Sequence, residues 1–196
     1  MRVTLEARRR RARVVVDEDA ENPRDEEFTF GTIVAWCRSY TLGDVQPEIT
    51  PREWEARLDM DTVCVILPVY LFMHSNLRVS TTPFRDRFDS GRLGSIYCTW
   101  DAARTHFESL GLYTGDLDLI EQARNALIAE VYAYDAYLNF EVYELHFEVE
   151  THIHGGWVTE DRTVGYYGTD IRRNGMIIDG DMPHMVKLVE EAIWEA

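Results

Sequence analysis

A strict alternation of apolar and polar side chains over residues 141–153 restricts this chain to folds that contain a half-buried sheet. Successive side chains of a β-strand point to opposite faces, so a period of two predicts one buried face and one solvent-facing face. The buried face would carry Leu145, Phe147, Val149, Thr151 and Ile153, and the solvent-facing one Glu144, His146, Glu148, Glu150, His152 and His154. Gly155 and Gly156 predict a hairpin turn into a second strand at Trp157.

Further strands are predicted where β-branched and aromatic residues lie between turn residues, at 30–37, 63–72 and 94–100. Segment 63–72 is almost wholly apolar, which predicts a central strand buried on both faces, although its Pro68 favours an edge or a bulge. Two short strands are expected at residues 2–6 and 12–16.

Helices are predicted from capping residues and from apolar spacing. Thr50 and Glu53 form a capping box around Pro51, which favours a short helix. From Asp116, taken as N-cap, apolar residues recur every three or four positions up to Leu138, and a last helix starts at Asp181. We therefore expect one α+β domain over residues 1–196. We expect two or three helices to pack against its mixed or antiparallel sheet. The basic and acidic segment 7–27 is expected to be flexible.

Acidic residues dominate the charge of the chain, with 35 Asp and Glu against 20 Lys and Arg and a formal net charge of −15. Binding to a nucleic-acid backbone depends on clustered cations that displace counterions. We therefore expect no direct nucleic-acid backbone binding, and we expect basic proteins to be the natural partners.

The N-terminal region changes from basic to acidic. Arginines cluster between Arg8 and Arg13, and the acidic segment that follows holds Asp17, Glu18, Asp19, Glu21, Asp25, Glu26 and Glu27. One interpretation is a pair of loops that neutralise each other by ion pairing. The alternative is an exposed interaction surface, in which these acidic residues would contact a partner.

The cysteines Cys37, Cys64 and Cys98 are odd in number, widely spaced and embedded in apolar runs. This pattern favours reduced core thiols in a cytoplasmic protein over disulfides or a zinc site. The N-terminal residues have no continuous apolar run typical of a signal peptide, and the longest apolar run, residues 63–73, is too short to cross a bilayer. We expect no membrane association.

Two groups of residues are candidates for chemistry. His146, His152 and His154 would share the polar face of the strand at 141–153 and could ligate zinc or another divalent ion, although a solvated polar face has the same pattern. His74 and Ser75, with Asp89, Ser90 and Gly91, contain the residue types of a hydrolase triad, but no nucleophile elbow is present. A turn at 89–91, with Gly91 at positive φ, is the alternative.

A series of motifs follows along the chain at residues 21–24, 31–40, 42–44, 67–70, 74–75, 80–84, 89–97, 165–170 and 174–176. The series resembles a family of small proteins carried by bacteriophages and mobile elements, over roughly residues 20–180. Cys37 departs from the His of that pattern, and Met73 and Asn76 replace its Asp and Gly. The resemblance implies no known reaction and extends to inhibitors of type II CRISPR nucleases, which would bind the nuclease or its guide complex and block DNA engagement.

The sequence thus predicts a phage-encoded protein that binds host machinery in the cytoplasm without a cofactor, as an anti-defence inhibitor of the anti-CRISPR type. A −15 chain would be steered toward the cationic channel of a nuclease. The alternatives are a metal-dependent enzyme that uses His146, His152 and His154, and a structural or regulatory phage protein that forms a homodimer through an exposed sheet edge.

Overall fold

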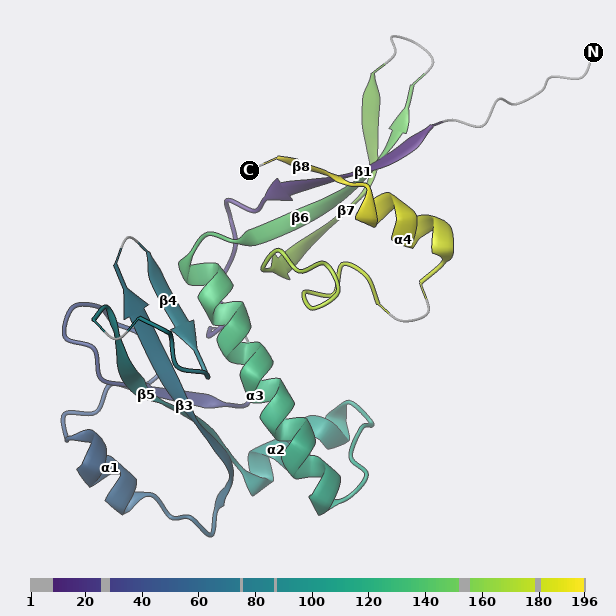
Figure 1. Ribbon diagram of the computed structural model, residues 1–196. Coiled ribbons are helices and arrows are strands. Elements are labelled where there is room, and N and C mark those ends of the chain that lie inside the picture. The colour runs from purple at the N-terminus through teal and green to yellow at the C-terminus, as the bar shows by residue number, and fades with distance from the viewer. Residues whose placement is uncertain are drawn as a thin grey trace, which may run out of the picture. The chain divides into compact units, whose positions relative to one another are not determined.

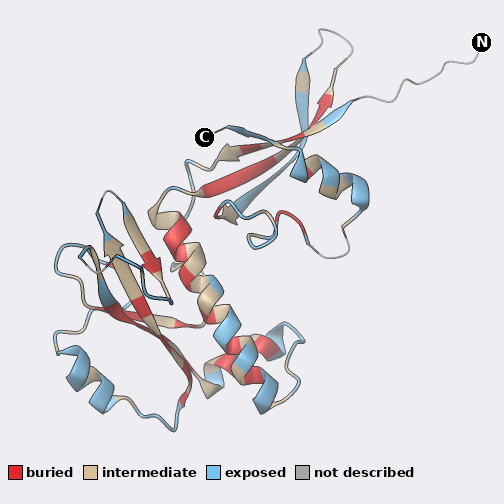
Figure 2. Cartoon of the chain, in the orientation of Figure 1, coloured by how far each residue is buried: buried red, intermediate tan, exposed pale blue. Residues whose placement is uncertain are grey.

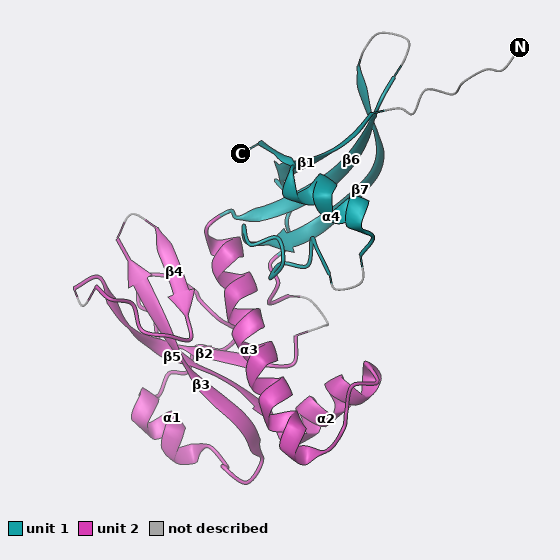
Figure 3. Cartoon of the chain, turned by 45° about the vertical axis from the view of Figure 1, so that its right-hand side comes forward, with its two compact units in different colours: residues 1–21, 140–196 teal, residues 22–139 magenta. Residues whose placement is uncertain are grey.

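The computed structural model describes residues 9–25, 29–74, 76–86, 88–151, 156–178 and 181–195. The chain divides into two compact units (Figure 3): unit 1 comprises Met1–Glu21 and Phe140–Ala196, and unit 2 comprises Asn22–Asn139. The predicted α+β class is confirmed, and the structure contains both a mixed and an antiparallel sheet, one in each unit.

Unit 2 contains an antiparallel sheet in the order β2-β5-β3-β4 (Figure 1), formed by β2 (Thr32–Ala35), β3 (Val63–Met73), β4 (Leu77–Ser80) and β5 (Ser90–Thr99). Burial alternates along β3, with Val63, Val65, Leu67 and Val69 buried and their neighbours partly exposed. The prediction that both faces of this strand are buried is therefore wrong. Strand β4 pairs only with Tyr70–Met73, so Pro68 has β5 alone as a partner strand and needs no donor on its other side.

Three helices belong to unit 2. The long helix α3 (Asp116–Leu138) packs against the sheet with a buried stripe (Figure 2). Ala123, Leu127 and Val131 are buried as the apolar spacing predicts, but Leu117, expected on the same face, is 88% exposed, and Leu119 is buried in its place. Its N-cap is Gly115 rather than Asp116. Helix α2 (Trp100–Ser109) precedes it and buries Ala103 and Phe107, and the short helix α1 (Pro51–Arg57) has the predicted capping box.

Unit 1 contains a mixed sheet in the order β7-β6-β1-β8, formed by β1 (Arg10–Val16), β6 (Val142–Glu150), β7 (Trp157–Tyr167) and β8 (Ile193–Glu195). Strand β1 pairs antiparallel with β6 and parallel with β8. Helix α4 (Pro183–Glu190) packs on β1 and completes a small core with Val14, Leu145, Met176 and Val189. The strand expected at 2–6 lies outside the described residues, and α4 begins two residues later than predicted.

Strand β7 is the long edge strand of this sheet, and most of its residues are exposed. Its register against β6 shifts twice, between Tyr143 and Leu145 and between Phe147 and Glu148. Bulges and charged side chains such as Asp161 are typical of edges that resist pairing with another chain. They disfavour β7 as the edge of a homodimer.

Candidate functional site

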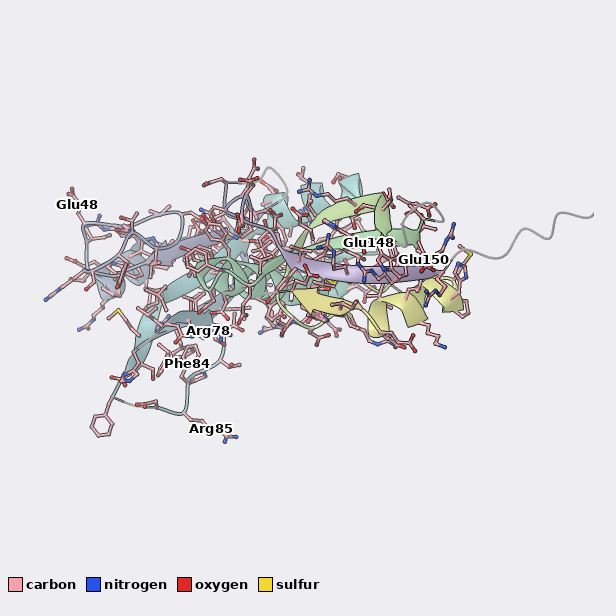
Figure 4. All side chains as sticks on the ribbon, turned by 90° about the horizontal axis from the view of Figure 1, so that it is seen from above. Glu48, Arg78, Phe84, Arg85, Glu148 and Glu150 are labelled. Atoms are coloured by element: carbon pink, nitrogen blue, oxygen red, sulfur yellow. The ribbon has the colours of Figure 1, made fainter. Side chains whose placement is uncertain are left out.

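The N-terminal arginines form ion pairs with glutamates of the unit 1 sheet. Arg11 and Arg13 both donate from Nε to Glu148, at 2.6 and 3.1 Å, and Arg9 donates twice to Glu150, at 2.6 and 2.7 Å. Figure 4 shows Glu148 and Glu150 beside β1. The predicted pairing between the basic cluster and the acidic segment is therefore absent from the described part of the chain.

The polar face of β6 is not the solvated face that its alternation predicts. Glu144 and Glu148 are only 8% and 5% exposed. Glu144 accepts from Arg162 and lies 2.6 Å from Nε2 of His146, whose Nδ1 lies 3.4 Å from Arg13. The long side chains of the arginines lie over these carboxylates and shield them from water, while part of each arginine side chain remains in contact with solvent. The alternation identifies which face is polar, but it cannot reveal this cover.

The predicted metal ligands are only partly described. His146 pairs with Glu144, whose carboxylate is already neutralised by Arg162, and His152 and His154 lie outside the described residues. Within the described ranges, no group of three His, Cys, Asp or Glu side chains is placed to hold a metal ion. The metal-dependent enzyme stays an untested hypothesis.

Glu144 should make unit 1 sensitive to acid. Hydrogen bonding from Arg162, followed by that from His146, lowers the pKa of Glu144 below its ordinary value, against an opposing effect of burial. A carboxyl with a lowered folded-state pKa stabilises the fold above its unfolded pKa of about 4.3 and loses this contribution as the pH falls through the folded value. We expect Glu144→Gln to flatten the pH dependence of the urea midpoint below about pH 4.3. An unchanged slope would contradict this role.

The acidic segment is exposed where it is described. Glu18, Asp19 and Glu21 of unit 1 are exposed, and Asp17, half-buried, accepts a hydrogen bond from the backbone N–H of Asp19 at 3.2 Å. Asp25, exposed in unit 2, follows, while Glu26 and Glu27 lie outside the described residues. Within the described chain none of these five carboxylates is in an ion pair. The interpretation as an exposed surface therefore fits the described carboxylates.

Three of the sequence motifs, at residues 21–24, 31–40 and 42–44, meet at a buried arginine in unit 2. The side chain of Arg24 is 4% exposed and donates to both carboxylate oxygens of Asp44, at 3.0 and 2.6 Å. It also donates to Glu130 at 2.6 Å and to the carbonyl of Gly31 at 2.6 Å. Desolvation opposes the guanidinium charge, but its carboxylate partners raise the pKa of Arg24 overall. The motif residues around Arg24 therefore stabilise the fold of unit 2.

The predicted turn at 89–91 is wrong. The carboxylate that bonds backbone N–H groups ahead of it is that of Asp86, which accepts from Phe88 and Asp89 at 2.8 and 3.2 Å. Ser90 and Gly91 begin β5, and Gly91 is not at positive φ.

Asp89 pairs instead with Nδ1 of His74, at 3.0 Å, and both side chains are partly exposed. A depression of about 360 Å³ is lined by Trp36, Met73, Phe88, Asp89 and Ser90, among others. The hydroxyl of Ser90 donates to the carbonyl of Asp86, and Ser75 lies outside the described residues. The structure therefore brings His74 and Asp89 together without aligning Ser90 as a nucleophile.

A larger hollow of about 660 Å³, here called the acidic hollow, lies at the start of α2, where the sequence predicts no site. Its lining comprises Asp61, Thr62, Thr99, Trp100, Asp101, Arg104 and Asp116. Arg104 and Asp116 pair at 3.0 Å, and this contact lowers the pKa of Asp116. Asp61 and Asp101 are exposed and have no ion pair among the described residues. These carboxylates come from three segments that are far apart in the sequence, so no local sequence pattern predicts the hollow.

Charge is distributed unevenly between paired and free side chains. Among the described residues, ion pairs engage Arg9, Arg10, Arg11, Arg13, Arg24, Arg78, Arg92, Arg104, Arg162, Arg172 and Lys187. Exposed carboxylates without an ion pair in the described chain include Glu18, Asp19, Glu21, Asp25, Glu48, Asp61, Asp101, Glu108, Asp118 and Glu121. Five exposed arginines also have no ion pair among the described residues: Arg38, Arg52, Arg57, Arg85 and Arg124. The free carboxylates outnumber them, so the free charge on the described surface is mainly negative.

The three cysteines are free thiols, as predicted, and Cys98 is buried. Burial raises the pKa of Cys98 to about 12, so its thiol stays protonated at neutral pH.

No helix in the described part of the chain is both long and apolar enough for a membrane span.

No family model matches this chain, and the curated proteins and the solved structures contain no match either. The resemblance to proteins of bacteriophages and mobile elements therefore stays a prediction carried by the sequence motifs.

Proposed function

We propose that this chain acts by binding a basic, nucleic-acid-binding protein through exposed carboxylates, in competition with the nucleic acid. The observation that carries the proposal is the unequal pairing of charges. Many of the described arginines are held in ion pairs within the chain, whereas carboxylates such as Glu18, Asp19 and Glu21 are exposed and form no ion pair with any described residue. Such a surface offers a basic partner the same sign of charge as a phosphate backbone.

The sequence motifs suggest which partner to test first. Their resemblance to bacteriophage proteins favours a host nuclease of the type II CRISPR class, with or without its guide RNA. A nuclease of this class holds its nucleic acid in a positively charged channel. The acidic segment 17–27 is the proposed contact surface, with Asp17, Glu18, Asp19 and Glu21 as its described members in unit 1.

Displacement of a fluorescent DNA duplex from such a nuclease–guide complex tests this function. The variant carries Asp17→Asn, Glu18→Gln, Asp19→Asn and Glu21→Gln; the amide at position 17 keeps an acceptor for the N–H of residue 19. We expect it to need about tenfold more protein for half-displacement, because four interfacial charges of a few tenths of a kcal/mol each add to that factor.

The matched control removes four carboxylates elsewhere, by Glu48→Gln, Asp161→Asn, Asp170→Asn and Asp181→Asn. Amides at 161, 170 and 181 keep the acceptors that bond nearby backbone N–H groups. The control should lose less than about threefold. Equal losses in both variants would contradict the assignment to segment 17–27, and displacement by neither wild type nor variant would contradict the proposed function in this partner.

A further inference from the structure

The connection between α2 and α3 presents an apolar patch to solvent. Leu110, Leu112 and Leu117, here called the leucine patch, are 56%, 52% and 88% exposed. All three lie within the eight residues 110–117. Helix α2 ends before this segment, α3 begins within it, and the two helices pack against each other. Single exposed leucines need no explanation, but a group of them marks a candidate interaction surface.

Backbone and side-chain hydrogen bonds hold this connection in place. The N–H of Leu112 donates to the carbonyl of Phe107 at 2.8 Å, and Nε2 of Gln122 donates to the carbonyl of Leu112 at 3.1 Å. Gly111 and Gly115 adopt positive φ, which lets the chain turn between the helices. The leucines are therefore displayed on a fixed backbone, so little ordering is needed on binding.

Carboxylates border the leucine patch. Glu108 precedes it on α2, and Asp118 and Glu121 flank Leu117 on α3; all three are exposed and have no ion pair among the described residues. Asp116, next to Leu117, lines the acidic hollow together with Asp101. The patch thus combines apolar side chains with a rim in which three exposed carboxylates outnumber the one exposed cation nearby on α3, Arg124.

We propose that the leucine patch docks a basic segment of the partner protein in which apolar side chains alternate with Lys or Arg. The proposal rests on the function proposed above and names a contact surface for it on unit 2. Charge complementarity selects this occupant, because cationic side chains would meet Glu108, Asp118 and Glu121 while apolar ones cover the leucines. A second copy, an anionic membrane or a nucleic acid would bring negative charge to the same rim.

Two synthetic peptides of equal charge test the patch with the full chain. One contains Lys and Leu, and in the other Ser replaces every Leu. We expect wild type to bind the Lys/Leu peptide about tenfold more tightly, because burial of a few leucine methylenes supplies that factor. The double variant Leu112→Ser and Leu117→Ser should reduce the preference to about twofold or less. Leu117→Ser alone, at a side chain 88% exposed, should reduce it partly and guards against misfolding.

Phe88→Ser is the matched control, since Phe88 is 99% exposed in the same unit but lies outside the patch. It should leave the preference unchanged. Equal binding of both peptides by wild type would overturn the patch while leaving the proposed function standing, and binding of neither at low salt would count against both. A dimer that Leu117→Ser dissociates would assign the patch to a second copy and overturn the proposal.

Discussion

Gly94→Ala should unfold unit 2 or destabilise it by about 3 kcal/mol or more. Gly94 lies in β5 opposite Ala35 of β2, and a Cβ on Gly94 would overlap the carbonyl oxygen of Val34. Backbone atoms of a paired strand cannot move aside as a flexible side chain can. The two strands would have to separate where Ile33 and Ile96 are fully buried. Urea denaturation followed by circular dichroism measures the loss.

Gly91→Ala provides the control for this change. Gly91 lies in the same strand, its φ is not positive, and a Cβ there would meet nothing within 4 Å. We expect its free energy of unfolding to change by less than about 0.5 kcal/mol. Equal effects at the two glycines would contradict the close approach of β2 and β5.

Arg24→Ala should destabilise unit 2 by about 3–5 kcal/mol. The change would leave the carboxylates of Asp44 and Glu130, 23% and 12% exposed, without their cation. It would also remove the donor to the carbonyl of Gly31. Arg24→Lys should recover only part of the loss, since one ammonium cannot reproduce the bidentate contact with Asp44.

An exposed ion pair is the appropriate comparison. Arg172 and Glu190 pair at 2.9 Å with side chains 61% and 48% exposed, so Arg172→Ala should cost less than about 1 kcal/mol. Both variants are measured by urea denaturation at neutral pH. A loss at Arg24 no larger than that at Arg172 would mean that the buried cluster does not stabilise the unit.

The sequence predicted those elements whose signal is local. Helix α3, the capping box at Thr50 and Glu53, and strand β6 all appear where expected. The patterns are less exact for burial, because Leu117 of α3 is exposed and Glu144 and Glu148 of β6 are buried. Strand β4 was not predicted, because its four residues are too few to show a periodic pattern. The pairing of β8 with β1 joins residues at opposite ends of the chain, which no local pattern encodes.

Helix α2 was missed for a different reason. The sequence pattern places Trp100 at the end of a strand at 94–100, and only Ala103 and Phe107 of this helix are buried, which leaves a weak apolar stripe. Its one clear signal is Thr99, whose side chain caps the helix by accepting from the N–H of Ala102 at 3.2 Å. Because α2 supplies Trp100 and Asp101 to the acidic hollow, the hollow was missed with it.

Charge predictions failed where they assumed that neighbours in sequence pair with each other. The arginines near the N-terminus are neutralised by Glu148, Glu150 and Glu195, more than 130 residues away, rather than by segment 17–27. This long-range pairing leaves Glu18, Asp19 and Glu21 exposed. The candidate surface therefore follows from the fold, although its residues were visible in the sequence.

The salt dependence of DNA displacement tests the central claim most directly. Wild-type protein is titrated against the nuclease–guide complex with its labelled duplex, while binding of the protein to the complex is recorded separately from binding of the duplex. If carboxylates compete for a cationic channel, the affinity of the protein should fall at least tenfold as salt rises from about 50 to 200 mM, because the added ions screen the attraction. An affinity that stays constant over this range would contradict the account.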